Sequence, residues 1–190
     1  METDFGALCY RRFLDGDESG FDEILKQYHD SLIFFINRLV KNYETAEDLA
    51  ADTFMELLVH KNRYRFKSSF KTYLFSIARH KAIDHIRKES RYHAVSVDAE
   101  NVRDLADFHS MEQEIIATDE KKRIQKLIST LAEDYATYLH LVYFEELTPD
   151  ETAKIMKKTK KQMANIAYRA KKALEEAMRK EDLRILYDRC

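Results

Sequence analysis

Four carboxylates recur at every fourth position in one stretch of the chain, at Glu44, Asp48, Asp52 and Glu56. On an α-helix this spacing places all four along one face, where like charges repel. Water can screen such a row, a basic partner can face it, or the oxygens can hold Mg²⁺ for phosphoryl chemistry. Metal sites of that kind draw ligands from facing helices, and the sequence offers no second acidic cluster on a matching helix. Taken alone, the row favours a solvated face over a partner-binding face, and a metal site least.

The sign of the charge reverses after this row. From Lys61 to Arg91 lysine and arginine are interleaved with aromatic residues, and only Asp84 and Glu89 oppose them. A base stacked on an aromatic ring contributes about 1–3 kcal/mol, which is comparable to the energy needed to extrude one base from a duplex. Such a segment can therefore hold opened DNA.

The aromatic residues of this segment divide into two kinds. The spacing of a buried helix face is found at Phe70, Tyr73, Leu74 and Ile77, which are expected in the core. Tyr64 and Phe66 lie instead in a charged stretch without a helical stripe. We therefore expect the rings of Tyr64 and Phe66 to be exposed.

Two helix-start signatures lie a few residues apart in the C-terminal part. In each, Thr148 or Thr159 can cap backbone N–H groups while Glu151 or Gln162, three residues on, reaches back. A short helix from Pro149, a tight turn and a longer helix is the plan of a helix-turn-helix. The second helix has core spacing at Met163, Ile166, Ala167, Ala170 and Leu174. From Lys154 to Lys180 many lysine and arginine residues are opposed by only two acids, Glu175 and Glu176. This excess of positive charge predicts a phosphate-binding surface.

Composition limits the class of protein. With 3 glycines and 1 proline in 190 residues, the chain is expected to be all-α. The net charge of −2 hides strongly segregated charges. Cys9 and Cys190 lack metal-ligand or disulfide-framework spacing. The acidic start has no apolar signal core, and no segment is long and apolar enough to span a bilayer. We expect a cytoplasmic protein without a membrane segment, metal or cofactor.

Helical periodicity fades once along the chain, where acids collect at Asp98, Glu100, Asp104 and Asp107. This predicts two small helical domains, 1–91 and 111–190, joined by a flexible acidic linker over 92–110. The second would be the helix-turn-helix domain.

Three runs of the first domain bring a family into view: Ala46 through Phe54, Ser69 through Ala78 and Ala82 through Lys88. They resemble the promoter-melting domain of bacterial sigma-70 family initiation factors, in the two-domain extracytoplasmic-function group. Leu147 through Met156 and Met163 through Leu174 resemble the helix-turn-helix domain of that group. The resemblance covers nearly the whole chain, with both halves in the family's order.

The resemblance implies roles that the charge pattern leaves open. The acidic helix would dock on the β′ clamp helices of core RNA polymerase through Glu47, Asp48, Asp52 and Glu56. The β subunit of the polymerase would be a further contact of the protein. Melted promoter DNA would contact the basic and aromatic segment at Tyr64, Phe66, Lys67, Arg79, His80, Arg87 and Lys88. The second helix of the pair would enter the major groove of the distant promoter element, with candidate contacts at Lys160, Lys161, Gln162, Asn165, Arg169 and Lys172. An anti-sigma factor is a further expected kind of partner.

The sequence departs from the family pattern at several positions, among them Tyr73, where a tryptophan is common. Ala51 replaces a glutamine of the docking helix, and His80 stands where asparagine is frequent. Lys157 and Lys158 occupy the turn, where the family usually has glycine. A residue with a Cβ must then adopt left-handed backbone geometry, at a cost of about 1 kcal/mol.

These observations predict a non-enzymatic sigma factor that binds core polymerase, recognises a two-part promoter and assists strand opening. One alternative is a stand-alone helix-turn-helix regulator, in which the basic and aromatic segment would have no purpose. Another is an all-α metal-dependent nucleotide hydrolase built on the acidic row, which needs a second carboxylate set.

Overall fold

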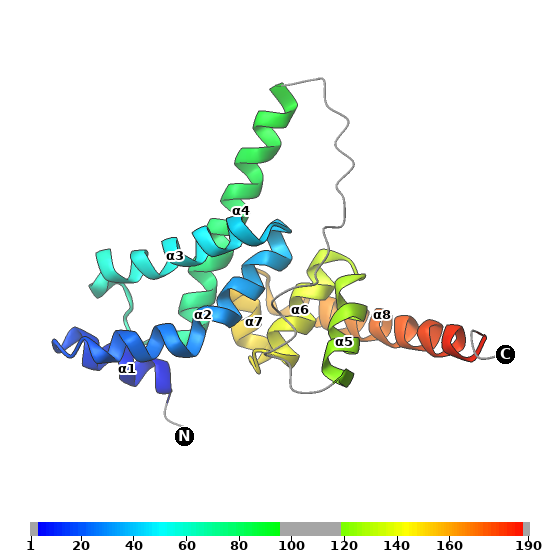
Figure 1. The fold of residues 1–190 in the computed structure, drawn as a ribbon. Helices are drawn as coiled ribbons and strands as arrows, with labels where there is room; N and C mark the ends of the chain where they lie inside the picture. The colour runs from blue at the N-terminus through cyan, green and yellow to red at the C-terminus, as the bar shows by residue number, and fades with distance from the viewer. Residues whose placement is uncertain (1–3, 96–118, 188–190) are drawn as a thin grey trace. The chain divides into compact units, whose positions relative to one another are not determined.

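The structure is a computed structural model that describes residues 4–95 and 119–187, and the prediction of an all-α chain is confirmed (Figure 1). Within these ranges all regular structure is helical. The helices are α1 (Phe5–Leu14), α2 (Ser19–Val40), α3 (Tyr43–Val59), the short 3₁₀ turn η1 (Lys61–Arg63), α4 (Phe70–Val95), α5 (Asp119–Ser129), α6 (Glu133–Tyr143), α7 (Pro149–Met156) and α8 (Lys160–Tyr187). None of these helices is long and apolar enough to cross a membrane.

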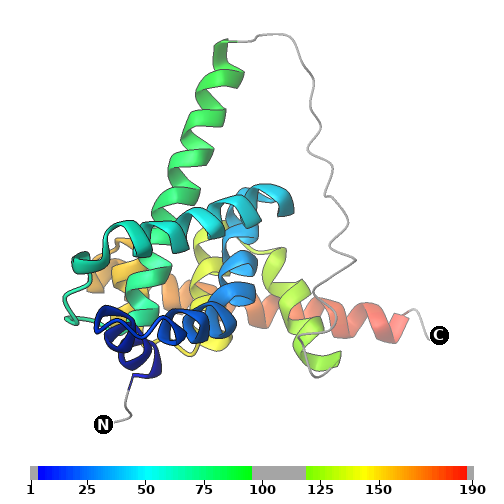
Figure 2. The ribbon, with the colours of Figure 1, turned by 60° about the vertical axis from the view of Figure 1, so that its left-hand side comes forward.

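The described helices fall into two compact units, the first holding α1–α4 and the second holding α5, α6, α8 and most of α7. The domain boundaries stay a prediction, and most of the predicted linker, 96–110, lies outside the described residues, as does the start of the predicted second domain up to residue 118. At its start, however, the predicted linker is helical, because α4 continues through 92–95 to Val95. The second half of α4 extends beyond the other helices of its unit (Figures 1 and 2).

In the first unit, α2 packs against α1, α3 and α4. Its core is a set of buried aliphatic and aromatic side chains that includes Tyr10, Ile24, Leu32, Phe35, Ile36, Leu57, Phe70, Leu74 and Phe75. Burying side chains of this size contributes about 1.5–3 kcal/mol each. Gly20 permits the close approach of α1 and α2, because a Cβ there would collide with the backbone oxygen of Cys9.

One carboxylate begins two helices of this unit. Asp4 accepts a hydrogen bond from the backbone N–H of Ala7 at 3.1 Å, which caps α1. Its second oxygen accepts from the N–H of Phe70 at 2.7 Å, at the start of α4. Because unpaired N–H groups at helix starts favour a negative charge, Asp4 fixes the start of α4 beside α1.

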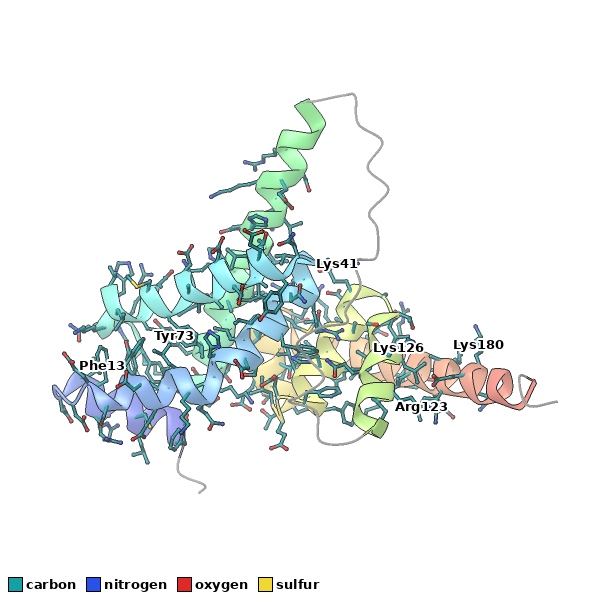
Figure 3. All side chains as sticks on the ribbon, in the orientation of Figure 1. Phe13, Lys41, Tyr73, Arg123, Lys126 and Lys180 are labelled. Carbon is teal, nitrogen blue, oxygen red and sulfur yellow. The ribbon has the colours of Figure 1, made fainter. Side chains whose placement is uncertain are left out.

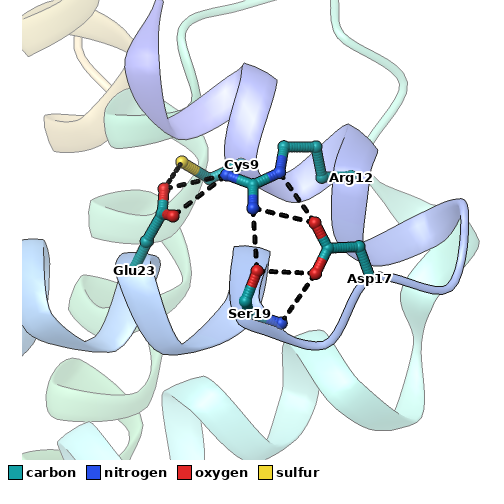
Figure 4. A network of polar contacts seen from close by, with 5 residues as sticks. All are labelled: Cys9, Arg12, Asp17, Ser19 and Glu23. Carbon is teal, nitrogen blue, oxygen red and sulfur yellow. Dashed lines mark hydrogen bonds and ion pairs between the residues drawn. The ribbon is translucent and has the colours of Figure 1, made fainter.

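A polar network joins the end of α1 to the start of α2 (Figure 4). Arg12 forms ion pairs with Asp17 at 2.8 Å and Glu23 at 3.0 Å and donates to the hydroxyl of Ser19 at 2.7 Å. The thiol of buried Cys9 donates to Glu23 at 3.1 Å. Burial and this carboxylate raise the pKa of Cys9 to about 11, so the thiol stays protonated and serves the fold.

In the second unit, α8 packs against α6 and α5. Fully buried side chains include Ile128, Leu139, Leu141 and Ala170. A buried histidine and a buried carboxylate, His140 and Glu145, face each other with 3.3 Å between Nε2 and Oε1.

Candidate functional site

The acidic face of α3 begins in the first turn after a helix cap. Asn42 accepts from the N–H of Thr45 at 2.8 Å and begins the helix. Four acids of this region are exposed and have no ion pair among the described residues: Glu44, Asp48 and Asp52 of the row, and the adjacent Glu47. The like charges of these acids remain unrelieved within the unit.

Glu56, at the end of the row, differs from the others. It is half-buried and forms ion pairs with Arg63 of η1 at 2.7 Å and with Lys81 of α4 at 3.3 Å. Glu56 therefore holds η1 and α4 to α3, and its charge is balanced inside the unit.

Apolar side chains accompany the acids on the outside of α3. Met55 is 53% exposed and Val59 is 67% exposed, and Ala51 is exposed as well. Exposed apolar side chains rimmed by polar or charged ones are a feature of protein-binding faces. Within the described residues no group of three or more histidine, cysteine or acidic side chains could hold a metal ion.

The expectation that Tyr64 carries an exposed ring is wrong. Tyr64 is 4% exposed, and its ring packs against Tyr10, Phe70 and Tyr73 at centroid distances of 5.7, 5.6 and 4.9 Å (Tyr73 is labelled in Figure 3). Burial, followed by the nearby charge of Asp4, raises the pKa of Tyr64. Since a buried ring has no free face, Tyr64 cannot stack on a base and instead anchors the loop.

Phe66 is half-buried at the tip of the same loop. Its φ of 55° lies in the left-handed region, which costs a non-glycine residue about 1–2 kcal/mol. One side of the ring lies 4.6 Å from the ring of Tyr64, and the guanidinium of Arg11 lies 4.9 Å from its centroid. Sequence reasoning missed Arg11, because no local pattern links α1 to this loop.

The remaining candidates of the first unit are placed on the loop and on α4. Lys67, His80, Arg87 and Lys88 are exposed, and Arg79 is half-buried. Asp84 lies 3.3 Å from His80 and 3.6 Å from Arg87. Exposed basic side chains thus line α4 while Asp84 partly balances two of them.

Both predicted capping boxes of the second unit are confirmed. Thr148 N–H donates to Glu151 at 3.0 Å, and Glu151 N–H donates to the Thr148 hydroxyl at 3.3 Å. The same exchange joins Thr159 and Gln162 at 2.8 and 3.3 Å. The two helices α7 and α8 are therefore set by short-range hydrogen bonds, as the helix-turn-helix interpretation requires.

The turn between these helices has the left-handed backbone geometry expected from the family's usual glycine, although a lysine stands there. Lys157 takes a φ of 52° where the family usually has glycine. Lys158 forms an ion pair with Asp134 of α6 at 2.8 Å. This pair helps to hold the turn despite the strain at Lys157.

The predicted DNA-facing side chains of α8 are all exposed: Lys160, Lys161, Gln162, Asn165, Arg169 and Lys172. On its opposite side, Met163 and Ala170 are buried and Ile166, Ala167 and Leu174 are half-buried. Two of the candidates have internal partners. Lys160 forms an ion pair with Asp150 at 3.0 Å, and the side-chain oxygen of Gln162 is occupied by the Thr159 cap.

An exposed aromatic side chain completes this face. Tyr168 is 70% exposed, three residues after Asn165. Helical spacing alone indicated that it points away from the core, but it was not among the predicted contacts. The face therefore offers amide, cationic and aromatic groups, which suit base edges and phosphates.

Comparisons with known proteins assign both units to one family. The model of sigma-70 region 2 matches residues 24–92, and that of sigma-70 region 4 matches residues 121–174. The RNA polymerase sigma factor YlaC of Bacillus subtilis is 26% identical over 159 residues, which cover 84% of this chain and 92% of YlaC. The ECF RNA polymerase sigma factor SigM of the same organism is 28% identical over 154 residues, covering 81% of this chain and 92% of SigM.

Solved structures agree on the fold. The sigma factor RpoE of Bartonella quintana, in a complex with the anti-sigma factor NepR, matches with a TM-score of 0.66 and 23% identity over 84% of this chain and 96% of that chain. CnrH, in a complex with the cytosolic domain of CnrY, matches with a TM-score of 0.63 and 15% identity. The match covers 92% of this chain and 97% of CnrH.

The two units, with a helix-turn-helix in the second and an acidic helix in the first, define a transcription initiation factor. The chain belongs to the sigma-70 family of RNA polymerase sigma factors, in its extracytoplasmic-function group. The stand-alone regulator is not favoured, because region 2 as well as region 4 is present.

Proposed function

We propose that this sigma factor acts in the cytoplasm and docks on core RNA polymerase through the outer face of α3. The observation that carries the proposal is the pairing of unrelieved carboxylates at Glu47, Asp48 and Asp52 with the exposed side chains of Met55 and Val59. A basic partner would relieve the repulsion, and the apolar groups would lose water on contact. The β′ clamp helices are the proposed partner of this face, with a further contact to the β subunit.

The loop and α4 are proposed to hold melted promoter DNA. Lys67, His80, Arg87 and Lys88 are exposed and Arg79 is half-buried, so their charges can follow a single-stranded backbone. The ring of Phe66 is the proposed stacking partner for an unpaired base, and the buried ring of Tyr64 packs against it. Catalysis stays with the polymerase, and this sigma factor needs no metal or cofactor of its own.

The face of α8 is proposed to bind the distant promoter element as a duplex. Asn165 has both its amide groups available for an adenine edge. Gln162 has its oxygen committed to the Thr159 cap, so its NH₂ group is the part that can donate to a base. Lys161, Arg169 and Lys172 are the proposed phosphate contacts, and Lys160 shares its charge with Asp150.

Regulation by an anti-sigma factor is proposed as well. The solved relatives RpoE and CnrH are held in complexes with NepR and with the cytosolic domain of CnrY. The same fold in this chain supports a partner of that class.

Transcription in vitro tests the proposed function. The full chain, added to purified core polymerase over a fragmented genomic library, should produce discrete transcripts that share two spaced sequence elements. Core polymerase alone supplies the control. A chain that binds single duplex fragments yet never alters transcript output from core polymerase would contradict the proposal.

A further inference from the structure

The loop over 64–69, between η1 and α4, is held at its start by α1. Tyr10 of α1 is fully buried, and its hydroxyl shares a proton between two backbone oxygens that precede the loop, that of Leu57 at 3.1 Å and that of Lys61 at 3.0 Å. The ring of Tyr10 packs edge-on against the ring of Tyr64, the first residue of the loop, with 5.7 Å between the centroids. One side chain of α1 thus fixes the point where the loop begins.

The cap of α1 holds the other end of the loop. The backbone N–H of Phe70, the first residue of α4, donates to Asp4 at 2.7 Å. Ser69 serves a different group, because its hydroxyl accepts from the N–H of Thr72 at 3.3 Å. Gly6 lets α1 lie this close to α4, since a Cβ there would come within 2.6 Å of a ring carbon of Phe70. An N–H group that a helix start leaves without an intrahelical partner is therefore bound from outside α4, at the point where the loop ends.

A third contact from α1 reaches the tip of the loop. The guanidinium of Arg11 lies 4.9 Å from the ring centroid of Phe66, whose φ of 55° is left-handed. A residue with a side chain keeps such a backbone conformation where the surrounding contacts fix it. The neighbouring Arg12 instead pairs with Asp17 and Glu23 (Figure 4). Arg12 therefore fastens α1 to the start of α2, whereas Arg11 fastens the loop to α1.

We infer that α1 and its cap form a brace that sets the loop for strand opening, and that Asp4, Tyr10 and Arg11 are positioning residues for this step. The brace lies outside the residues 24–92 that the region 2 model matches. Because the brace orders the loop when the protein folds, the conformational entropy of the loop no longer opposes its contact with opened DNA. The inference rests on the proposed function, which assigns the loop to melted DNA, and it names the residues outside the loop that determine how fast opening occurs.

A tryptophan reporter measures the order of the loop in the full-length chain. The sequence contains no tryptophan, so Phe66→Trp places a single indole at the tip. In this background Tyr10→Phe keeps the ring and removes the hydroxyl, while Asp4→Ser keeps a residue that caps α1 but is too short to reach Phe70 as well. The two changes together should raise the quenching of the indole by acrylamide about two- to threefold, because the loop opens locally more often.

Arg12→Gln in the same background is the matched control. It removes the ion pairs of α1 with Asp17 and Glu23 and leaves the three contacts with the loop in place. Because exposed ion pairs contribute little to stability, it should change acrylamide quenching by less than about 1.3-fold. Equal quenching in the control and in the double variant of Asp4 and Tyr10 would overturn the brace.

Strand opening by the holoenzyme tests the functional part of the inference. The promoter is a fragment recovered by transcription of the genomic library, and the permanganate reactivity of its thymines reports opening. Without the tryptophan reporter, the double variant of Asp4 and Tyr10 should open this promoter about three- to tenfold more slowly, which is the size expected from lost hydrogen bonds. Its co-purification with core polymerase should stay unchanged.

A template with a pre-opened bubble separates positioning from general stability. It should restore transcription by the double variant to the level of the parent chain, whereas a protein that is partly unfolded would stay defective on it. Opening at the parent rate, or slow transcription that the bubble does not restore, would overturn the brace.

Arg11 provides a second variant that leaves the core untouched, since its side chain is exposed. Arg11→Ala should slow opening about threefold, because the ring of Phe66 loses its cation. Arg11→Lys, which keeps a cation for the ring, should restore the parent rate. Equal rates for Arg11→Ala and the parent chain, or no recovery with lysine, would count against the brace.

The two proposals can fail separately. Acrylamide quenching uses neither polymerase nor promoter, whereas co-purification with core polymerase depends on α3 and leaves the brace unused. A chain that initiates transcription equally well with and without the brace contacts disproves the brace alone. A chain that shows the expected quenching but never initiates with core polymerase disproves the proposed function.

Discussion

Helices α3 and α8 each carry a row of like charges on an exposed face, and the two rows differ in what accompanies the charge. On α3 the carboxylates are followed along the helix by Met55 and Val59, which are 53% and 67% exposed. On α8 the cations are accompanied by Asn165 and by Tyr168, which is 70% exposed. Apolar side chains among charges suit a protein surface, whereas amide and aromatic groups among cations suit nucleic acid.

The rows also share a feature, because in each one a terminal member serves the fold. Glu56 forms ion pairs with Arg63 and Lys81, and Lys160 forms one with Asp150. The other charges of both rows lack such partners within the described residues. Like charges one turn apart destabilise a helix by about 0.2–0.5 kcal/mol per pair, so a partner that relieves this repulsion gains binding energy from each unpaired member.

We expect the largest effect from reversing two charges of the α3 row. Asp48→Arg combined with Asp52→Arg should abolish binding to core polymerase, because the changes place like charges opposite a basic partner. The fold should persist, since both side chains are exposed and the repulsion along the row is relieved. Co-purification with core polymerase measures docking, and circular dichroism checks helicity.

Asp15→Arg with Asp30→Arg is the matched control for this variant. Both residues are exposed acids of the first unit outside α3, so the change of charge is the same. If the control loses core polymerase to the same extent, net charge rather than the α3 face governs docking. Retained binding in the Asp48 and Asp52 variant would show that the row is a solvated face.

The next largest effect is expected at Asn165 of α8, the proposed base-reading residue. Asn165→Ala should cost about 1–3 kcal/mol on the preferred duplex and relax discrimination at one or two base pairs, because an amide reads an adenine edge through two hydrogen bonds. Its salt dependence should change little. Titrations on matched and mismatched duplexes measure both effects, and an equal loss on every duplex would mean that Asn165 does not read bases.

The parts of this fold that the sequence predicted depend on short-range contacts. Each capping box joins residues three apart, Thr148 with Glu151 and Thr159 with Gln162, so its residue types reveal it directly. The left-handed geometry at Lys157 was expected for another reason, the glycine that usually stands in this turn of the family. Periodicity was less reliable at the end of α4, where the helix continues through 92–95 although the apolar spacing of its sequence has faded.

The parts that the sequence did not predict depend on distant partners. Tyr64 lies in a segment without a stripe, and only the convergence of Tyr10, Phe70 and Tyr73 around it makes it core. Charge spacing grouped Glu56 with Asp48 and Asp52, because spacing along one helix cannot show that η1 and α4 neutralise it.

A smaller effect distinguishes Glu56 from the rest of its row. Glu56→Gln keeps the size of the side chain but removes both ion pairs, so the free energy of unfolding should fall by about 1 kcal/mol or less. Affinity for core polymerase should change less than twofold. Urea denaturation and a core polymerase titration measure the two quantities, and the opposite result, stable protein with weakened docking, would return Glu56 to the docking face.

The smallest effect concerns phosphate anchoring on α8. Lys172 lies more than a turn beyond Asn165, where side chains of a recognition helix typically meet the DNA backbone. Lys172→Ala should weaken binding to all duplexes alike and reduce the log-log salt slope by about one unit, as the loss of one phosphate contact requires. Lys180, which projects from α8 farther along (Figure 3), supplies the control, because Lys180→Ala should leave the slope unchanged. A sequence-dependent loss with Lys172→Ala would instead assign this lysine to base recognition and extend the reading face of α8 by another turn.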